Sequence, residues 1–261
     1  MDGLTPWMQA YILVLAAILG ACVASFANCM GWRIVHGESV LRGRSHCDVC
    51  GHALGPADLV PVVSYLAAKG RCRYCKAKLS ARHVWGELIA MAVFVGIVMK
   101  FGLTLETVEY LLFAAILLAA SFADLEGYII PDRFIVAGIA VRLVFILVSG
   151  NIGKELLFSA LGGFAVAGGL LLIVLIYEKL THKEAMGGGD IKLLFVTGLV
   201  LGWKRNLLCL FFACIVGIVF GMLTRRGRTG KAFPFGPSIA IAAFFALLFG
   251  DGLIASYLAM F

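Results

Sequence analysis

Charged residues are scarce in this sequence of 261 residues. Asp, Glu, Lys and Arg together make up 14% of it, whereas an ordinary soluble domain carries about a quarter. Hydrophobic residues make up 62%, against roughly half in a soluble domain. This composition excludes an ordinary soluble globular protein. It predicts an all-α polytopic membrane protein, because each spanning helix needs about 20 mostly apolar residues.

Two familiar sequence signals are also missing. Residues 1–7 contain no Lys or Arg, and no small-residue cleavage site interrupts the apolar run that follows. We therefore expect the first helix to be retained rather than removed as a signal peptide. No G-x-G-x-x-G segment follows a predicted strand, which excludes a conventional Rossmann cradle for a nucleotide-like cofactor.

Apolar runs of near-membrane length predict about eight transmembrane helices. Several of these runs are short enough that two of them could be re-entrant instead. The expected spans are 7–30, 84–100, 107–122, 134–149, 156–177, 190–203, 207–223 and 236–260.

Basic residues are distributed unequally between the loops. Sixteen of the 22 Lys and Arg residues lie in the loops at 31–83, 123–133, 178–189 and 224–231, and four lie in the opposite set. Because positively charged loops stay in the cytoplasm, we expect these four loops inside the cell and the N-terminus outside. The net charge of +7, including the basic cluster of the last loop, is thus explained by topology and anionic lipid. Nucleic acid is not an expected partner.

The sequence divides into three regions. They are a first transmembrane helix at 1–30, a cytoplasmic loop domain at 31–83 and a membrane-embedded domain at 84–261. The loop domain is too small to build a stable core without an additional crosslink such as a metal ion.

Four cysteines of the loop domain form two C-x2-C knuckles. Cys47 and Cys50 make the first knuckle, Cys72 and Cys75 make the second, and 21 residues separate the two. Each knuckle can present two thiolates to one ion, and four thiolates complete the tetrahedral shell of structural zinc. The sequence therefore predicts a zinc-ribbon-like loop whose folding depends on the metal. A pair of redox disulfides is the alternative, which the cytoplasmic placement disfavours.

The remaining cysteines and the neighbouring histidines have simpler interpretations. His46 and His52 could replace a thiolate, but with four cysteines present they are expected to be ordinary loop residues. The cysteines within predicted spans are expected to act as small hydrophobic residues; they are Cys22, Cys29, Cys209 and Cys214.

Two acidic residues stand out because they lie at the ends of predicted spans. Asp124 follows the third span, and Asp190 follows a triple-glycine turn and begins the sixth span. The predicted topology puts both at the cytoplasmic face. Two neighbouring carboxyls can share one proton, so that one acts as base and the other as acid, as in aspartic proteases. From the residues alone, a helix-capping Asp190 and a solvated interfacial Asp124 are the alternatives.

Two further charged residues lie near or within the fourth span. Asp132 follows Pro131 and is expected to be a helix N-terminal charge, with a place in the lining of the site as the alternative. Arg142 lies about midway through the span, so it is expected to face the helix bundle or a water-filled cavity. The sequence does not identify its partner.

Several segments, spread over almost the whole chain, together resemble the type IV prepilin peptidases. In that family the first Asp of D-x6-P-D and the Asp of G-x-G-D are the catalytic pair, and the resemblance carries this role onto Asp124 and Asp190. The matching segments are Ser25-Phe26-x-Asn28 with Arg33, the two cysteine knuckles, Ser80-x-Arg82 with Glu87, Asp124 with Pro131-Asp132, Gly187-x-Gly189-Asp190-x-Lys192-Leu193, and Pro234-Phe235-Gly236-Pro237.

The resemblance implies an enzyme with two activities. An aspartic peptidase domain at 84–261 would cleave the basic leader of type IV prepilins or type II secretion pseudopilins at the cytoplasmic face of the bacterial inner membrane. The enzyme would then methylate the new N-terminal residue with S-adenosylmethionine. The resemblance assigns no residues to the methyl donor, and only the cytoplasmic loop and its flanks, including Glu87, are suggested. Prepilins or pseudopilins and membrane lipid are the expected partners.

Acidic residues at the cytoplasmic rim suggest how a basic leader would be attracted. They are Glu126, Asp132, Glu178 and Glu184.

Two other functions are compatible with the paired carboxyls. A GxGD intramembrane protease would cut within transmembrane helices, but its pair would lie deeper and the cysteine loop would stay unexplained. A transporter would use Asp124 and Asp190 as a proton relay. The two halves of the sequence show no internal repeat, which disfavours the transporter.

Overall fold

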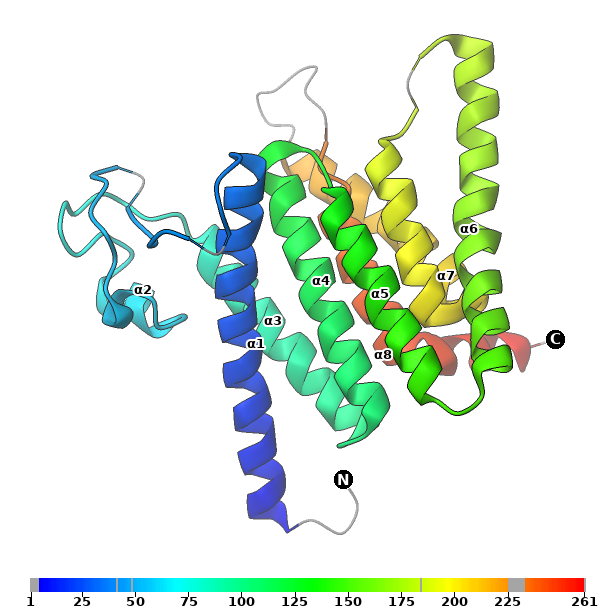
Figure 1. The fold of residues 1–261 in the computed structure, drawn as a ribbon, viewed down its shortest axis with the longest axis horizontal. Helices are drawn as coiled ribbons and strands as arrows, with labels where there is room; N and C mark the ends of the chain where they lie inside the picture. Colours follow the sequence, from blue (N-terminus) through cyan, green and yellow to red (C-terminus); the bar gives the residue numbers. More distant parts are fainter. Residues whose placement is uncertain (1–4, 41, 48, 184, 225–232, 261) are drawn as a thin grey trace. The chain divides into compact units, whose positions relative to one another are not determined.

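The computed structural model describes residues 5–40, 42–47, 49–183, 185–224 and 233–260. Within these residues the chain is helical apart from its loops, and β pairing is limited to two isolated bridges (Figure 1). The prediction of an all-α protein is confirmed. The helices are α1 (Pro6–Val35), α2 (Val63–Ala67), α3 (Arg82–Phe101), α4 (Leu105–Gly127), α5 (Asp132–Val148), α6 (Ile152–Thr181), α7 (Gly188–Thr224) and α8 (Gly236–Leu258), with a short 3-10 helix at Pro56–Asp58.

Six helices of the described chain are long and apolar enough to cross a membrane, namely α1, α3, α4, α6, α7 and α8. α5 has 17 residues, slightly fewer than the roughly 20 that a span usually needs. α7 contains two of the predicted spans. Each of the eight predicted spans therefore falls on a helix to within two residues at its ends, and the polytopic membrane architecture is confirmed.

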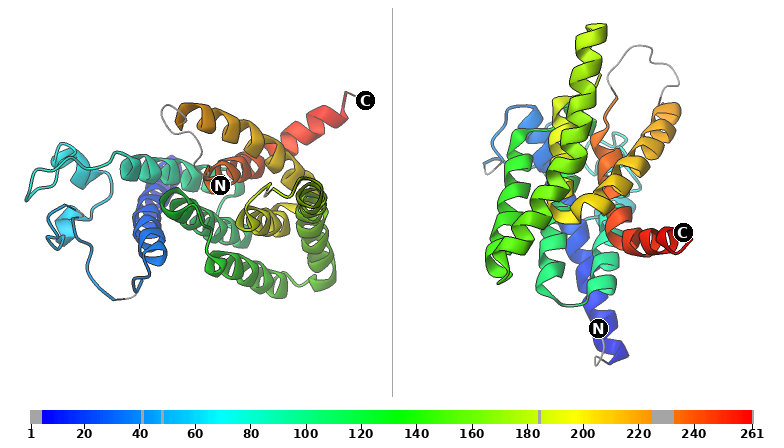
Figure 2. Two further views of the ribbon diagram at one scale, coloured as in Figure 1. Left: turned by 90° about the horizontal axis from the view of Figure 1, so that it is seen from above. Right: turned by 90° about the vertical axis from the view of Figure 1, so that its right-hand side faces the viewer.

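α7 consists of two helical segments that meet at Gly202. A straight helix of its 37 residues would be about 55 Å long, nearly twice the roughly 30 Å of a hydrocarbon core. Gly202 instead has φ 74° and ψ 167°, a backbone conformation that is essentially restricted to glycine. A Cβ at this position would also overlap the ring of Phe158. The chain turns at Gly202 (Figure 2), one residue before the predicted end of the span at 190–203, and the span at 207–223 lies in the second helical segment.

The fully buried side chain of Asn206 holds this turn together. Its amide nitrogen donates to the carbonyl oxygen of Leu194 at 3.1 Å and to that of Gly162 at 3.3 Å. Its amide oxygen accepts a hydrogen bond from the Thr197 hydroxyl at 2.8 Å. In a straight helix the 12 positions between Leu194 and Asn206 would separate them by about 18 Å, so these bonds require the chain to fold back.

Replacing Asn206 with Leu is expected to destabilise the protein by about 2–3 kcal/mol, because three buried hydrogen bonds are lost and their partners are left unsatisfied. The free energy of unfolding in mixed detergent micelles measures this effect. Asn151→Leu is the matched control, because Asn151 is exposed and its replacement is expected to change stability by no more than about 0.5 kcal/mol. Equal stabilities of the two variants would contradict the role assigned to Asn206.

The chain forms two compact units, Met1–Phe122 and Ala123–Phe261. In the first unit α1 packs against α3, and a Cβ on Gly20 would lie 2.7 Å from the carbonyl oxygen of Ala90. In the second unit α6 packs against α7, and a Cβ on either Gly162 or Gly198 would overlap the carbonyl oxygen of the other. Small residues thus bring the helix backbones of both units close together, as is common in membrane helix packing.

Arg142 lies buried in α5 of the second unit. Its Nε donates to the hydroxyl of Ser159 at 2.8 Å, and its guanidinium forms an ion pair with the carboxylate of Glu155. Both partners belong to α6. The expectation that Arg142 faces the helix bundle is confirmed, and the structure supplies partners that the sequence does not identify.

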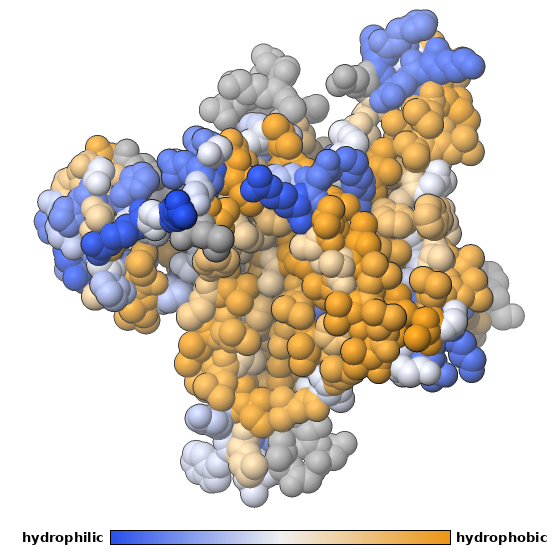
Figure 3. Space-filling view, viewed as in Figure 1, coloured by the Kyte–Doolittle hydropathy of each residue, from blue (hydrophilic) through white to orange (hydrophobic). Residues whose placement is uncertain are grey.

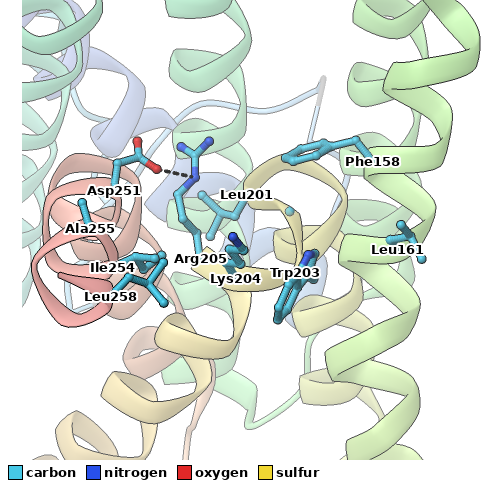
Figure 4. Close-up of a pocket in the computed structure, with 11 residues that line it drawn as sticks. Phe158, Leu161, Leu201, Trp203, Lys204, Arg205, Asp251, Ile254, Ala255 and Leu258 are labelled. Atoms are coloured by element: carbon cyan, nitrogen blue, oxygen red, sulfur yellow. Dashed lines mark ion pairs between the residues drawn. The ribbon is translucent and has the colours of Figure 1, made fainter. Parts of the chain in front are cut away.

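A cavity of about 500 Å³ lies beside the turn of α7 in the second unit (Figure 4). Phe158 of α6, Trp203 of α7 and Leu258 of α8 are among its lining residues. Nε of Arg205 forms an ion pair with Oδ1 of Asp251 at 3.3 Å in its wall (Figure 4). The lining includes neither of the two predicted site carboxyls, so this cavity is separate from the candidate site.

Candidate functional site

Asp124 occupies the last turn of α4 and is 4% exposed. Its backbone carbonyl accepts the N–H of Tyr128 at 2.9 Å, and Tyr128 has a left-handed φ of 56°, which ends the helix. The carboxylate Oδ2 of Asp124 accepts the backbone N–H of Gly236 at 2.7 Å. Gly236 is the first residue of α8. The first N–H groups of a helix lack partners within it and carry partial positive charge, so α8 stabilises this carboxylate.

This contact requires the glycine of the segment Pro234-Phe235-Gly236-Pro237. A Cβ on Gly236 would lie 2.9 Å from Oδ2 of Asp124 and 3.2 Å from its Cβ, so a larger residue would displace the carboxyl. Pro237 stands in the first turn of α8, where its missing N–H costs no hydrogen bond. The contact joins residues 112 positions apart. The sequence alone therefore could not show that this segment contacts Asp124.

Asp190 lies in the first turn of α7 and is partly buried. Its backbone N–H donates to the carbonyl oxygen of Gly187 at 3.1 Å. A Cβ on Gly189 would lie 3.1 Å from the Cβ of Ile130, so the glycine lets this turn approach the connection between α4 and α5. Asp190 directly follows Gly189, and the connection that this turn contacts begins at the end of α4, where Asp124 lies. The structure therefore places the two segments that carry the selected carboxyls against each other, and the catalytic role of the pair stays a prediction.

An ion pair joins the same two segments on their exposed side. Nζ of Lys192 lies 2.6 Å from Oδ1 of Asp132, and the two side chains are 53% and 70% exposed. Asp132 is the first residue of α5, as expected of a helix N-terminal charge. An exposed pair of this kind contributes little stability, about 0–1 kcal/mol. Its position links the D-x6-P-D and G-x-G-D segments to each other.

Cys47, Cys50, Cys72 and Cys75 form a second cluster, in the first unit. Their sulfur atoms all lie within 4.8 Å of one another. Four ligands at the usual zinc–sulfur distance of about 2.3 Å lie roughly 3.8 Å apart, so this four-cysteine cluster can hold a metal ion with small adjustments.

The two knuckles have matching backbones. The N–H of Gly51 donates to Cys47 O at 2.8 Å, and that of Lys76 donates to Cys72 O at 3.0 Å. Gly51 and Lys76 also share a left-handed φ, of 68° and 61°. Two equivalent turns thus present two sulfurs each to one point.

Three residues of the prepilin peptidase pattern hold the loop between α1 and α3. The guanidinium of Arg33 donates to the carbonyl oxygens of Ser39, Val40 and Arg42, each at 3.3 Å. The amide of Asn28 bonds to His83 at 2.6 Å, and the buried carboxylate of Glu87 accepts the N–H of Val62 at 2.7 Å. The structure therefore gives these residues contacts inside the first unit, and a role of Glu87 in methyl transfer stays a prediction.

The suggested acidic rim is only partly described. Glu178 accepts the N–H of Ala185 at 3.2 Å and thus holds the segment that follows α6. Glu184 and the basic cluster at 225–231 lie outside the described residues. Attraction of a basic leader by this rim stays a prediction.

These features define a polytopic helical membrane protein with a paired-carboxylate site and a separate four-cysteine loop. Residues 18–101 match the bacterial peptidase A24 N-terminal domain, and residues 111–222 match the type IV leader peptidase family. The chain belongs to the type IV leader peptidase family. The resemblance stated from the sequence is thereby confirmed, and with it the class of enzyme, a peptidase.

Curated relatives agree with this assignment along nearly the full length of the chain. A prepilin leader peptidase/N-methyltransferase of Bacillus subtilis is 32% identical over 256 residues, which cover 95% of this chain and 99% of the relative. Proteins of the same name from Aeromonas salmonicida and Myxococcus xanthus are each 35% identical, over 82% and 88% of this chain and 74% and 68% of their own. No solved structure matches.

Proposed function

We propose that this protein removes the leader peptide of prepilins or pseudopilins at the cytoplasmic face of the inner membrane and then methylates the new N-terminal residue. The observation that carries the proposal is the close approach of the turn before Asp190 to the connection after Asp124, at the ends of two membrane helices, within a chain of the type IV leader peptidase family. The names of the relatives, prepilin leader peptidase/N-methyltransferase, support both activities.

We assign Asp124 as the base and Asp190 as the acid. The N–H of Gly236 stabilises the ionised form of Asp124, so the shared proton resides on Asp190. Asp124 removes a proton from a water molecule as the water oxygen bonds to the scissile carbonyl carbon. Asp190 then gives its proton to the departing amine as the C–N bond breaks.

The four-cysteine loop is proposed to bind zinc as a structural ion. Cys47, Cys50, Cys72 and Cys75 would hold it, and their closed set of four sulfurs leaves no position for a reacting group. The ion would crosslink the two knuckles of the loop domain at 31–83, while the membrane-embedded domain at 84–261 carries the peptidase. S-adenosylmethionine would supply the methyl group of the second reaction.

The proposed orientation places the N-terminus outside and the site in the cytoplasm. Its support is the excess of Lys and Arg in the loop at 31–83 and in the loops on the same side.

Purified protein in liposomes, given a matched prepilin and S-adenosylmethionine, tests the proposal by the mass of the products. The expected products are a leader-free pilin and, later, the same pilin with one added methyl group. Cleavage within the transmembrane helix of the substrate would support an intramembrane protease instead. Intact substrate together with proton-coupled uptake into the liposomes would support the transporter.

Replacing Gly236 with Ala is expected to lower kcat of leader cleavage about 10–100-fold, because the added Cβ displaces the Asp124 carboxyl and misplaced catalytic groups lose rate. Gly252→Ala in the same helix is the matched control, because no atom lies within 4 Å of its added Cβ. Comparison of kcat for the two variants checks the prediction. Unchanged cleavage by the Gly236 variant would remove α8 from the site.

A further inference from the structure

The loop between α1 and α3 exposes an apolar segment, residues 59–68. Its sequence, LVPVVSYLAA, contains no charged residue. Leu59, Val60, Val63 and Leu66 are 44%, 44%, 61% and 66% exposed. A contiguous group of exposed apolar side chains outside the spanning helices indicates a binding surface.

A partly buried hydrogen bond fixes the position of Val62, within the apolar segment, along α3. The N–H of Val62 lies 2.7 Å from the carboxylate of Glu87, which is five residues, or about 7.5 Å, beyond the first residue of α3. The 20 residues of α3 are about 30 Å long, roughly the thickness of the hydrocarbon core. Val62, within the apolar segment, therefore lies beside the first turns of a spanning helix and not beyond its end.

The backbone of Val62 adopts an unfavourable conformation at the point where it contacts Glu87. Val62 has a φ of 60° and a ψ of −51°, a positive-φ conformation that a β-branched residue rarely adopts. Such a conformation persists only where surrounding contacts impose it, and the bond to Glu87 is such a contact.

The charge around the apolar segment is predominantly basic. The loop from 36 to 81 has seven basic residues and three acidic ones, and Figure 3 shows hydrophilic and hydrophobic surface next to each other on it. Trp85, at the start of α3, is 64% exposed, as is typical of aromatic residues at a membrane interface. The basic residues are Arg42, Arg44, Lys69, Arg71, Arg73, Lys76 and Lys78.

We propose that the apolar segment 59–68 is an interfacial anchor that inserts into the anionic leaflet next to α3. Its apolar side chains enter the boundary between headgroups and acyl chains, and the surrounding Lys and Arg side chains contact lipid phosphates. The short helix α2, of five residues, leaves backbone groups that need water, so the segment stays in the interface and does not cross the membrane. The anchor fixes the four-cysteine loop at the lipid surface whether or not the protein is a peptidase.

Photocrosslinking of the full-length protein tests the anchor. Benzoylphenylalanine replaces Leu66, Val63 or, as a matched control, Val49, which is apolar, 72% exposed and in the same loop but outside the apolar segment. The proteins are illuminated in liposomes of phosphatidylethanolamine and phosphatidylglycerol. Lipid adducts, counted by mass spectrometry, are expected to be at least five times more abundant at positions 63 and 66 than at position 49.

Two results would overturn the anchor. One is an equal yield of lipid adducts at positions 66 and 49. The other is the appearance of adducts between position 66 and an added prepilin in place of lipid adducts, which would make the apolar segment a protein-binding surface. An unchanged metal content shows that each labelled loop is folded, so neither result can be attributed to unfolding.

Discussion

Asp124→Asn and Asp190→Asn are each expected to lower kcat of leader cleavage by about 1,000-fold or more, because each substitution removes a proton-transfer group from the reaction. Asparagine keeps the size of aspartate, and its amide oxygen at position 124 can still accept the N–H of Gly236. The fold and the bundle of helices are therefore expected to remain intact. Cleavage of a matched prepilin, measured under single-turnover conditions, gives the rates.

Asp251→Asn is the matched control for these two variants. Asp251 lies in the same unit and pairs with Arg205, but it lines the cavity beside the turn of α7. Its replacement is expected to change the rate of cleavage less than about threefold, because the group takes no part in the reaction. A normal rate for either the Asp124 or the Asp190 variant would exclude the two-carboxyl mechanism.

Cys72→Ser is expected to release the metal and to unfold the four-cysteine loop. Structural zinc contributes on the order of 10 kcal/mol or more to the folding of small metal-binding segments, and a loop of this size has little core of its own. Amide exchange at 46–52 and 71–79 is therefore expected to become at least about 100 times faster. Hydrogen-exchange mass spectrometry, together with zinc analysis of the purified protein, measures both effects.

The α7 residue Cys214 provides the control for this experiment, because it is exposed and does not belong to the four-cysteine cluster. Cys214→Ser is expected to keep one zinc ion per chain and a protected loop. Retention of the metal by the Cys72 variant, or a loop that stays protected after chelation, would contradict a structural zinc site.

Local patterns explain why so much of the architecture could be predicted. Apolar runs mark the spans because a membrane allows few alternatives to a helix, and even the separation of the spans at 190–203 and 207–223 agrees with the turn at Gly202. The spacing of the cysteines within the two C-x2-C knuckles is visible in the sequence, and it predicts the cluster of four sulfur atoms. Asp124 and Asp190 were selected because carboxyls at the ends of apolar helices are rare, and their catalytic role stays a prediction.

Contacts between distant parts of the chain could not be predicted in the same way. Such contacts depend on which faces of two helices pack against each other. Examples are the bond from Gly236 to Asp124, the partners of Arg142 on α6 and the ion pair of Lys192 with Asp132. Hydrophobic periodicity carries no such information in a chain whose helices are apolar on all sides. The glycines gave a partial indication of these contacts. Ile130 lies close to Gly189, and the Asp124 carboxyl lies close to Gly236.

The hydrogen bond between Gly236 and Asp124 forms late in the synthesis of the chain. α8 follows the other helices of the described chain. The ribosome therefore makes those helices before it makes Gly236, whose N–H forms a hydrogen bond with Asp124. Until α8 has been made, Asp124 lacks this hydrogen-bond donor. If Asp124 acts as proposed, a nascent chain that still lacks α8 holds this carboxyl without its hydrogen bond, and its cleavage of substrates is expected to be slower than that of the finished protein.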